Sequence, residues 1–462
     1  MFRFKSYPEM TKIVIPNSIN LINADFNYAF YNMKNLVTSE INHKNITNMY
    51  YMYDACSNLK NYASSSPNAI DMRYAYYNCY NLTGSPVCSN NISYMMYTYS
   101  NCFNITGSPV CGPNVLSMNR TYQNCFSLTG SPVCGDKVGY MHSTYLNCQN
   151  LTGNAVCGPN VVAMDSTYAN CQNLTGSPAC GPNVTNMYSA YANCIKLKGP
   201  PVCGNNVKYM YATYQGCSNL TGPPACGPNV TNMNRTYDGC SNLTGSPVCG
   251  PNVTDMSEAY DNCYRLTGSP VCGDKVTSMF STYNNCTNLT GVAVFGNSVH
   301  SLYNAYWNCR NLSAGDIYMR GASVTYVAGC FGRKNTSRRY NIHVPANSIT
   351  LNTCLTNNVN SLVRDNITWT NAGTYYYNTT YNIRIYPDLS IRKIEFSIGG
   401  VTYQADDGMT FYDWSLSEYN VDGHVIDITI LAQCSLDGRR YNYDDFIIDG
   451  VNYTLIKNPE YG

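Results

Sequence analysis

The chain is dominated by one 23-residue unit that repeats without a slip. Cysteine returns at this interval at Cys56, Cys79, Cys102, Cys125, Cys148, Cys171, Cys194, Cys217, Cys240, Cys263, Cys286 and Cys309. A methionine column from Met49 to Met279 and an aromatic column from Phe30 to Tyr306 keep the same period. A fixed period of this length is the signature of a solenoid, in which each unit buries its apolar face only against its neighbours. We therefore expect one elongated repeat body.

The apolar positions within a unit predict its local structure. Val115, Met118, Tyr122 and Cys125 are spaced 3, 4 and 3 residues apart, which is typical of one face of a short helix. Residues 129–135 contain glycine and proline and predict an extended arm that re-enters the core. We therefore predict an α/β solenoid that resembles leucine-rich repeats. It has roughly twelve rungs, each a short helix plus a short strand, stacked at about the 4.8 Å strand spacing.

The repeat also sets the expected domain boundaries. Residues 1–22 are interpreted as an N-terminal cap, 23–333 as the solenoid and 334–387 as its C-terminal cap. Residues 388–462 are expected to form a small α+β domain. In that domain two glycines at 399–400 join two strands into a hairpin, and residues 409–419 form a helix.

Charge and hydropathy exclude several classes of function. The formal net charge is +1 and only 12% of residues are charged, so nucleic acid is not an expected partner. No run of apolar residues is long enough for a membrane span. Residues 1–8 lack the apolar run of a secretory signal, which favours synthesis without export.

The 24 cysteines are interpreted as buried, reduced side chains. All but three fall in two columns of the repeat, and rungs at the strand spacing hold equivalent side chains slightly too far apart for a disulfide. Free cysteine packs as a small hydrophobe. Some disulfides remain an alternative. Zinc is disfavoured, because no pair has the close spacing that zinc sites use.

Enzymatic chemistry has little support, and we expect no catalytic residues, cofactor or metal. The five histidines stand in unrelated contexts, without a cysteine or carboxylate at a suggestive spacing: His43, His142, His300, His343 and His424. Asp406-Asp407 and Asp444-Asp445 are interpreted as acids in turns. Asn-x-Ser/Thr sequences recur at Asn81, Asn183, Asn229 and Asn288, and the repeat itself explains them. Asparagines just before the cysteines, such as Asn124, are expected to form a ladder that satisfies turn backbone groups.

The most informative column is the variable one. The residue directly after each methionine changes from unit to unit, which marks a solvent-facing position. Aromatic residues in this column are suited to contact sugar rings or a protein partner, and they form the candidate binding face: Tyr50, Tyr188, Tyr211, Phe280 and Tyr303.

Two stretches carry the resemblance to a known family. Residues 183–197 and 229–243 fit the pattern V-x-x-M-x-x-x-F-x-x-C-x-x-L and resemble the BspA-like leucine-rich repeats of bacterial surface proteins. The resemblance covers roughly residues 20–330. It departs from the family in using tyrosine for the usual phenylalanine, and Thr-Gly-Ser-Pro-Val-Cys for a leucine-rich arm. It implies adhesion and partner binding rather than catalysis. Residues 408–419 are similar to a short module of tailed-phage and prophage proteins.

These features lead to two functional hypotheses. The first is a non-enzymatic virion component of a tailed phage, in attachment, a fibre or decoration, made in the host cytoplasm. The alternative is a bacterial cell-surface adhesin of the BspA-like class. The expected partner is a protein or glycan on a host surface, or another virion protein, and a homo-oligomer is possible. An enzyme would need a clustered site in residues 334–462, and the sequence shows none there.

Overall fold

The computed structural model describes residues 7–313 except 17, 20, 22–23, 42–44 and 62–65. Beyond these it describes 315–318, 324, 330, 340–345, 384–386, 391–398, 401–405, 431–434, 447–448 and 451–452. The chain divides into two compact units. The first is Met1–Gly250 with Asn262–Tyr264, and the second is Pro251–Asp261 with Arg265–Gly462.

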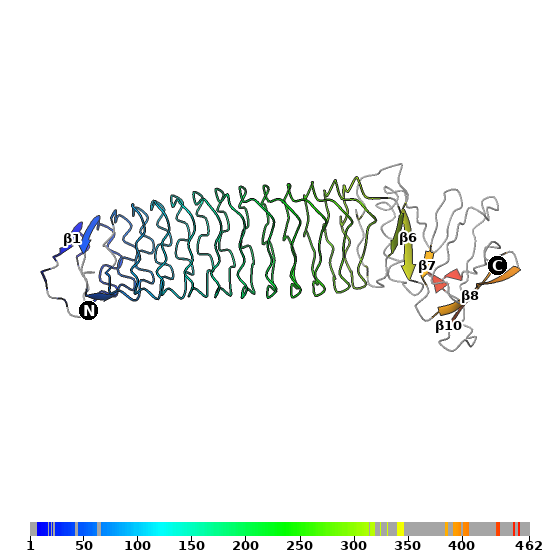
Figure 1. Ribbon diagram of the computed structural model, residues 1–462, viewed down its shortest axis with the longest axis horizontal. Coiled ribbons are helices and arrows are strands. Elements are labelled where there is room, and N and C mark those ends of the chain that lie inside the picture. The colour runs from blue at the N-terminus through cyan, green and yellow to red at the C-terminus, as the bar shows by residue number, and fades with distance from the viewer. Residues whose placement is uncertain are drawn as a thin grey trace. The chain divides into compact units, whose positions relative to one another are not determined.

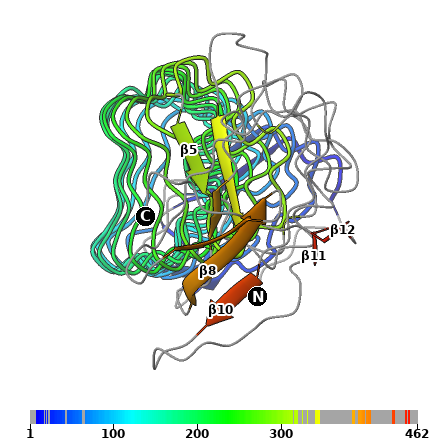
Figure 2. The same cartoon turned by 90° about the vertical axis from the view of Figure 1, so that its right-hand side faces the viewer.

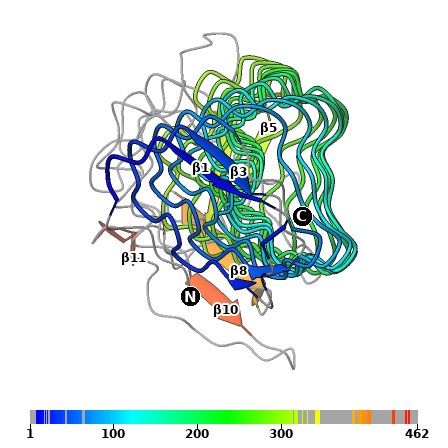
Figure 3. The same ribbon diagram turned by 90° about the vertical axis from the view of Figure 1, so that its left-hand side faces the viewer.

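The first unit is a stack of similar rungs (Figure 1), and its rungs superpose when they are viewed end-on (Figures 2 and 3). At its start, β1 (Lys12–Ile15) pairs in parallel with β3 (Thr38–Ile41), and β2 (Ala24–Asp25) pairs in parallel with β4 (Ile46–Asn48). Later rungs are joined by single parallel bridges at the residue before each methionine, from Asn48 to Asn232. The prediction of a stacked repeat is confirmed.

The prediction of a helix in each rung is wrong for the described rungs, because that segment folds into consecutive turns. The Thr121 N–H donates to the Met118 carbonyl at 3.0 Å, and the Cys125 N–H donates to the Tyr122 carbonyl at 3.1 Å. The third residues of these turns, Arg120 and Asn124, have φ of 53° and 61°. A four-residue turn with positive φ at its third position is a type II turn.

The backbone amides between these turn bonds explain why the helix is absent. The Arg120, Tyr122 and Asn124 N–H groups donate to carbonyls of the next rung at 2.8–2.9 Å. A helix would use these groups within its own rung, and an isolated helix of three turns is marginal in any case. Two successive four-residue turns still bring Met118 and Cys125 to the same side, where both are fully buried. The expected buried positions are therefore correct although the expected helix is not.

Asparagines at the turn position with positive φ form a ladder along the rungs. Asn124 Nδ2 donates to Asn101 Oδ1 at 2.6 Å, and Asn147 Nδ2 donates to Asn124 Oδ1 at 2.6 Å. Asparagine tolerates the left-handed conformation better than most residues. The ladder that we expected is present, but its amides bond to one another rather than to turn backbone groups.

The extended arm is held by a tyrosine hydroxyl instead of by a strand ladder. Tyr145 Oη accepts a hydrogen bond from the Val133 N–H at 3.0 Å and donates to the Val133 carbonyl at 2.7 Å. The neighbouring Pro132 has no N–H to donate. Tyr122 and Tyr168 bond their own arms in the same way. This contact explains why tyrosine stands where the family usually has phenylalanine.

The fully buried tyrosine rings stack on one another along the first unit. Neighbouring rings from Tyr53 to Tyr237 have centroids 5.3–5.6 Å apart. Beside them, Thr144 Oγ1 donates to the Met118 carbonyl of the preceding rung at 2.9 Å. The core therefore combines stacked rings with polar groups that are satisfied by the neighbouring rung.

In the second unit the rings of Tyr260, Tyr283 and Tyr306 stack with centroids 5.5 and 5.2 Å apart. The strands that the structure describes in this unit form three sheets. The strands β5 (Gly315–Tyr318), β6 (Tyr340–Pro345) and β7 (Arg384–Tyr386) are parallel. The strands β8 (Ile391–Ile398), β9 (Val401–Ala405) and β10 (Leu431–Cys434) are antiparallel, in the order β10-β8-β9. The strands β11 (Ile447–Ile448) and β12 (Val451–Asn452) form an antiparallel pair.

Several predictions for the second unit can be compared with these strands. The hairpin across residues 399–400 is confirmed, because Ile398 pairs with Val401. The expected helix at 409–419 and the paired acids at 406–407 and 444–445 lie outside the described residues. The boundaries at 22, 333 and 387 remain predictions.

We predict that Tyr145→Phe destabilises the protein, because it removes only the hydroxyl that satisfies the Val133 backbone. Losing the partner of a buried polar group typically costs about 1–3 kcal/mol, and Val133 is only half-buried, so the lower part of that range is expected. Urea unfolding measures the change. Tyr140→Phe is the matched control, because Tyr140 is 53% exposed. Equal effects of the two substitutions would contradict this role for the hydroxyl.

Candidate functional site

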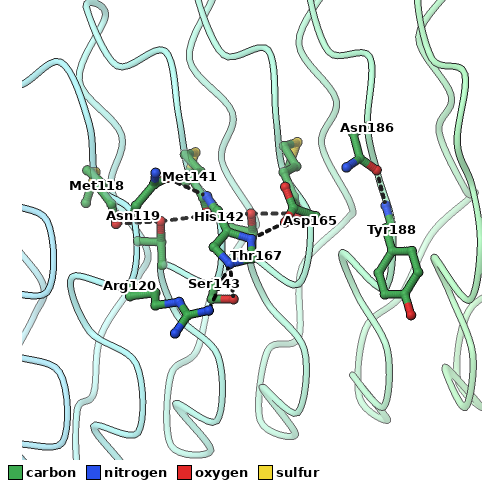
Figure 4. A network of polar contacts seen from close by, with 12 residues as sticks. Met118, Asn119, Arg120, Met141, His142, Ser143, Asp165, Thr167, Asn186 and Tyr188 are labelled. Atoms are coloured by element: carbon green, nitrogen blue, oxygen red, sulfur yellow. Dashed lines mark hydrogen bonds and ion pairs between the residues drawn. The ribbon is translucent and has the colours of Figure 1, made fainter.

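The residue after each methionine lies at the second position of the first turn in its rung, with its side chain outward. We call this row in the first unit the post-methionine face: Tyr50, Arg73, Met96, Asn119, His142, Asp165, Tyr188, Tyr211 and Asn234. The side chain before the methionine orients it in several rungs. Asn186 Oδ1 accepts the Tyr188 N–H at 3.0 Å (Figure 4), and Asp71 Oδ1 accepts the Arg73 N–H at 2.9 Å.

The structure brings four of the five predicted aromatic residues together in pairs. Tyr188 and Tyr211 stack with centroids 4.7 Å apart and planes 14° apart, and Tyr188 is 46% exposed. In the second unit Phe280 and Tyr303 stack at 5.2 Å. Tyr50 contacts other aromatic residues, outside the predicted set.

Sequence reasoning missed a second aromatic column, two residues after the methionine position, which Phe26 occupies in the rung of Tyr28. Tyr28, Tyr51, Tyr74 and Tyr97 stack with centroids 4.4–4.8 Å apart. Tyr50 packs edge-on against the Tyr51 ring at 4.4 Å. The signal was available, because these four tyrosines recur at the repeat interval of 23 residues. We call them the tyrosine ladder.

Two arginines extend the aromatic region of the face. The Arg73 guanidinium lies 4.9 Å from the Tyr50 ring centroid and 5.2 Å from that of Tyr94, and it forms an ion pair with Asp71 at 2.6 Å. The hydrogen bonds that the Arg73 guanidinium donates to Asp71 raise the pKa of Arg73. The Arg120 guanidinium covers the Tyr97 ring at 5.4 Å. Arginine placed over a ring is a favourable cation–π contact.

A polar network follows the aromatic region along the same face (Figure 4). His142 Nδ1 pairs with Asp165 Oδ2, and the His142 N–H donates to Asn119 Oδ1 at 3.0 Å. Arg120 Nη2 lies 3.4 Å from His142 Nε2. Because arginine only donates, Nε2 is the acceptor and Nδ1 carries the proton toward Asp165. Our expectation that no histidine has a carboxylate at a suggestive spacing is wrong here, since 23 residues bring Asp165 onto the next rung.

In the same network a serine contacts the histidine and the histidine contacts an aspartate, which is the series of contacts found in serine hydrolases. Ser143 Oγ lies 3.4 Å from His142 Nε2, but Ser143 is only 3% exposed. The Ser143 N–H donates to the Asp165 carbonyl at 2.9 Å, so it does not point toward an oxyanion. The network therefore positions polar side chains on the face, and its geometry does not suit acyl transfer.

The asparagines of the Asn-x-Thr sequences form hydrogen bonds between rungs, which agrees with their explanation by the repeat. Asn183 Nδ2 donates to the Pro159 carbonyl, and Asn229 Nδ2 donates to the Asn205 carbonyl, both at 2.9 Å. A modification at these amides would break a contact between rungs.

The 22 cysteines that the structure describes are free thiols. In the first column the thiol donates to the preceding rung, as Cys148 Sγ does to the Tyr122 carbonyl at 3.0 Å. The second column is half-buried, and burial raises the pKa of Cys134 to about 11 and that of Cys157 to about 12. These thiols are protonated at neutral pH. Among the described residues, no group of three or more His, Cys, Asp or Glu side chains is arranged to hold a metal ion.

Comparisons with known proteins agree with the repeat. Residues 1–131 match the family model described as BspA type Leucine rich repeat region, in six copies. These residues carry a BspA-type leucine-rich repeat. A similar solved structure is a leucine rich cell surface protein from Faecalibacterium prausnitzii A2-165. It has 13% sequence identity and a TM-score of 0.31, over 66% of this chain and 87% of that chain. No curated protein matches the chain. No helix in the described part of the chain is long and apolar enough to span a membrane.

We predict that denatured, unreduced protein has nearly all of its 24 thiols free. In the native protein, iodoacetamide should modify half-buried Cys134 before fully buried Cys148, because only the former reaches solvent. Peptide mass spectrometry after timed alkylation measures both results. More than a few disulfides would contradict the reduced columns, and equal alkylation rates would contradict the difference in burial.

Proposed function

We propose that this chain is a non-enzymatic repeat protein that binds a partner protein through the post-methionine face, as a cell-surface adhesin of the leucine-rich-repeat class. The supporting observation is the face itself. Its side chains differ from rung to rung, whereas the backbone and core behind it hardly change. Because the turn amides are used for stacking, the outward side chains are free to vary without cost to the fold.

The BspA-type repeat supports the adhesin over the virion component. That repeat resembles those of bacterial surface proteins, which implies adhesion. The resemblance to a phage module rests on residues 408–419, which lie outside the described part of the chain. No comparison includes a phage protein. The adhesin is therefore the function that we retain.

The stacking of the rings favours a protein over a glycan as the partner. Sugars bind aromatic residues mainly through the ring faces. Tyr188 and Tyr211 each cover one face of the other, and the tyrosine ladder does the same over four rungs. The inner rings of the ladder, Tyr51 and Tyr74, are stacked on both faces, so their edges and hydroxyl groups remain, which suit the mixed polar and apolar contacts of protein interfaces. In the Tyr188–Tyr211 pair, stacking covers one face of each ring.

We predict that Tyr188→Ser combined with Tyr211→Ser removes partner binding and leaves the fold intact. Protein and glycan arrays are probed in parallel with the purified chain and with the variant. We expect hits on the protein array that weaken at least tenfold, because the paired rings form the contact. Tyr209→Ser is the matched control, since Tyr209 is 52% exposed but lies before the methionine, outside the face. Hits confined to glycans, or hits unaffected by the double variant, would contradict the proposal.

We predict that Met187→Ala separates the fold from the face. Met187 is fully buried, and truncation of such a side chain typically costs about 2–5 kcal/mol. Tyr188→Ser removes one exposed stacked ring, for which about 0.5–1.5 kcal/mol is expected. Denaturant unfolding compares the two. If Tyr188→Ser destabilises the protein as much as Met187→Ala, the assignment of the two faces fails.

A further inference from the structure

Asp54 is a buried carboxylic acid in which one oxygen has no hydrogen-bond partner. It lies five residues after Met49, beside the post-methionine face, and is only 6% exposed. Its Oδ1 is inaccessible to solvent and has no hydrogen-bond partner. No ion pair to Asp54 occurs among the described residues. An unpaired buried carboxylate is costly, so such a group needs either a proton or a cation.

Packing does not explain this acid. Most later rungs of the first unit place neutral residues at the same position, including Ser100, Gln123 and Leu146. The acid recurs at Asp238, where Gln215 Nε2 donates to it. The turns around them are the same as those around Asp54. A neutral side chain would therefore satisfy the fold without the penalty of a buried charge.

Tyrosines flank Asp54 along the repeat. Tyr31 and Tyr77 occupy the equivalent position on the rungs before and after Asp54. Tyr31 contacts Tyr28 edge-on at 5.7 Å, and Tyr77 contacts Tyr74 edge-on at 5.6 Å. Both are half-buried, so the cluster lies at the surface of the rungs. Burial, together with neighbours that include Asp54, raises the pKa of Tyr28, which agrees with this proximity.

We propose that Asp54, between Tyr31 and Tyr77 and beside the tyrosine ladder, forms a binding site for a protonated primary amine, such as the lysine side chain of a partner protein. A positive charge is attracted by both the carboxylate and the aromatic rings. A carboxylate accepts hydrogen bonds, which a primary ammonium can donate and a quaternary ammonium cannot. A hard metal ion would need several more oxygen ligands.

The site deepens the proposed function, since it names one group that the partner contributes. Arg73 shows that this part of the chain already uses the same chemistry, because a cation there is held by a carboxylate and by two tyrosine rings. At Asp54 the carboxylate and the rings are present. The cation is the missing component.

The test uses the full chain and n-butylammonium, which imitates a lysine side chain. Binding is measured by calorimetry at pH 8. Burial raises the pKa of Asp54 to about 7, so the carboxyl is ionised at this pH, and the amine remains protonated. We expect n-butylammonium to bind at least tenfold more tightly than neutral n-butanol, and more tightly than choline. Asp54→Asn should weaken amine binding at least tenfold, and Tyr77→Leu should weaken it less.

Asp54→Asn keeps the shape of the side chain and removes a buried charge, so we expect it to unfold at the same urea concentration as the parent chain or a higher one. Asp238→Asn is the matched control at the same repeat position, where Gln215 Nε2 already donates to the carboxylate at 3.0 Å. Equal binding of n-butylammonium and n-butanol would overturn the site, and so would unchanged amine binding by Asp54→Asn or tighter binding of choline. These outcomes concern the amine alone and are separate from array results on Tyr188 and Tyr211.

Discussion

The hydrogen bonds between a buried tyrosine hydroxyl and its own arm, made in the first unit from Tyr99 to Tyr237, are the contacts on which the rung depends. In a short arm with proline, the backbone cannot pair continuously with the neighbouring rungs. Tyr145 Oη satisfies both the N–H and the carbonyl of Val133, so one side chain replaces two ladder bonds. The ring beneath that hydroxyl stacks on the rings of the adjacent rungs. The same residue therefore closes its own rung and joins it to the next.

The other side of the rung follows a complementary rule, because its backbone amides alternate between two partners. The Thr121 N–H closes a turn within the rung, whereas the Tyr122 N–H donates to the next rung. This alternation needs positive φ at Arg120 and Asn124. Backbone hydrogen bonds join the rungs, so the side chain of the residue after each methionine is not needed for stacking and faces outward.

Function is therefore expected where the repeat is least uniform. The tyrosine ladder, the His142 network and the Tyr188–Tyr211 pair are placed on identical turns, and they differ only in the side chains that those turns present. Stacking in the tyrosine ladder covers both faces of the inner rings and leaves their edges and hydroxyl groups, which favours a protein partner. Asp54 adds a buried charge to this tyrosine-rich region.

The sequence by itself determined the period, the stacked repeat and the buried positions, because a strict 23-residue interval forces equivalent residues such as Tyr122 and Tyr145 to meet. It did not distinguish a helix from consecutive turns, since both bring Met118 and Cys125 to one side with the same spacing. Only the tertiary structure decided between them, because the choice depends on whether each N–H bonds within its rung or to its neighbour. The contact of His142 with Asp165, and the lack of a partner for Asp54 Oδ1, also depend on which side chains meet across rungs. The local sequence around each residue does not show which side chains those are.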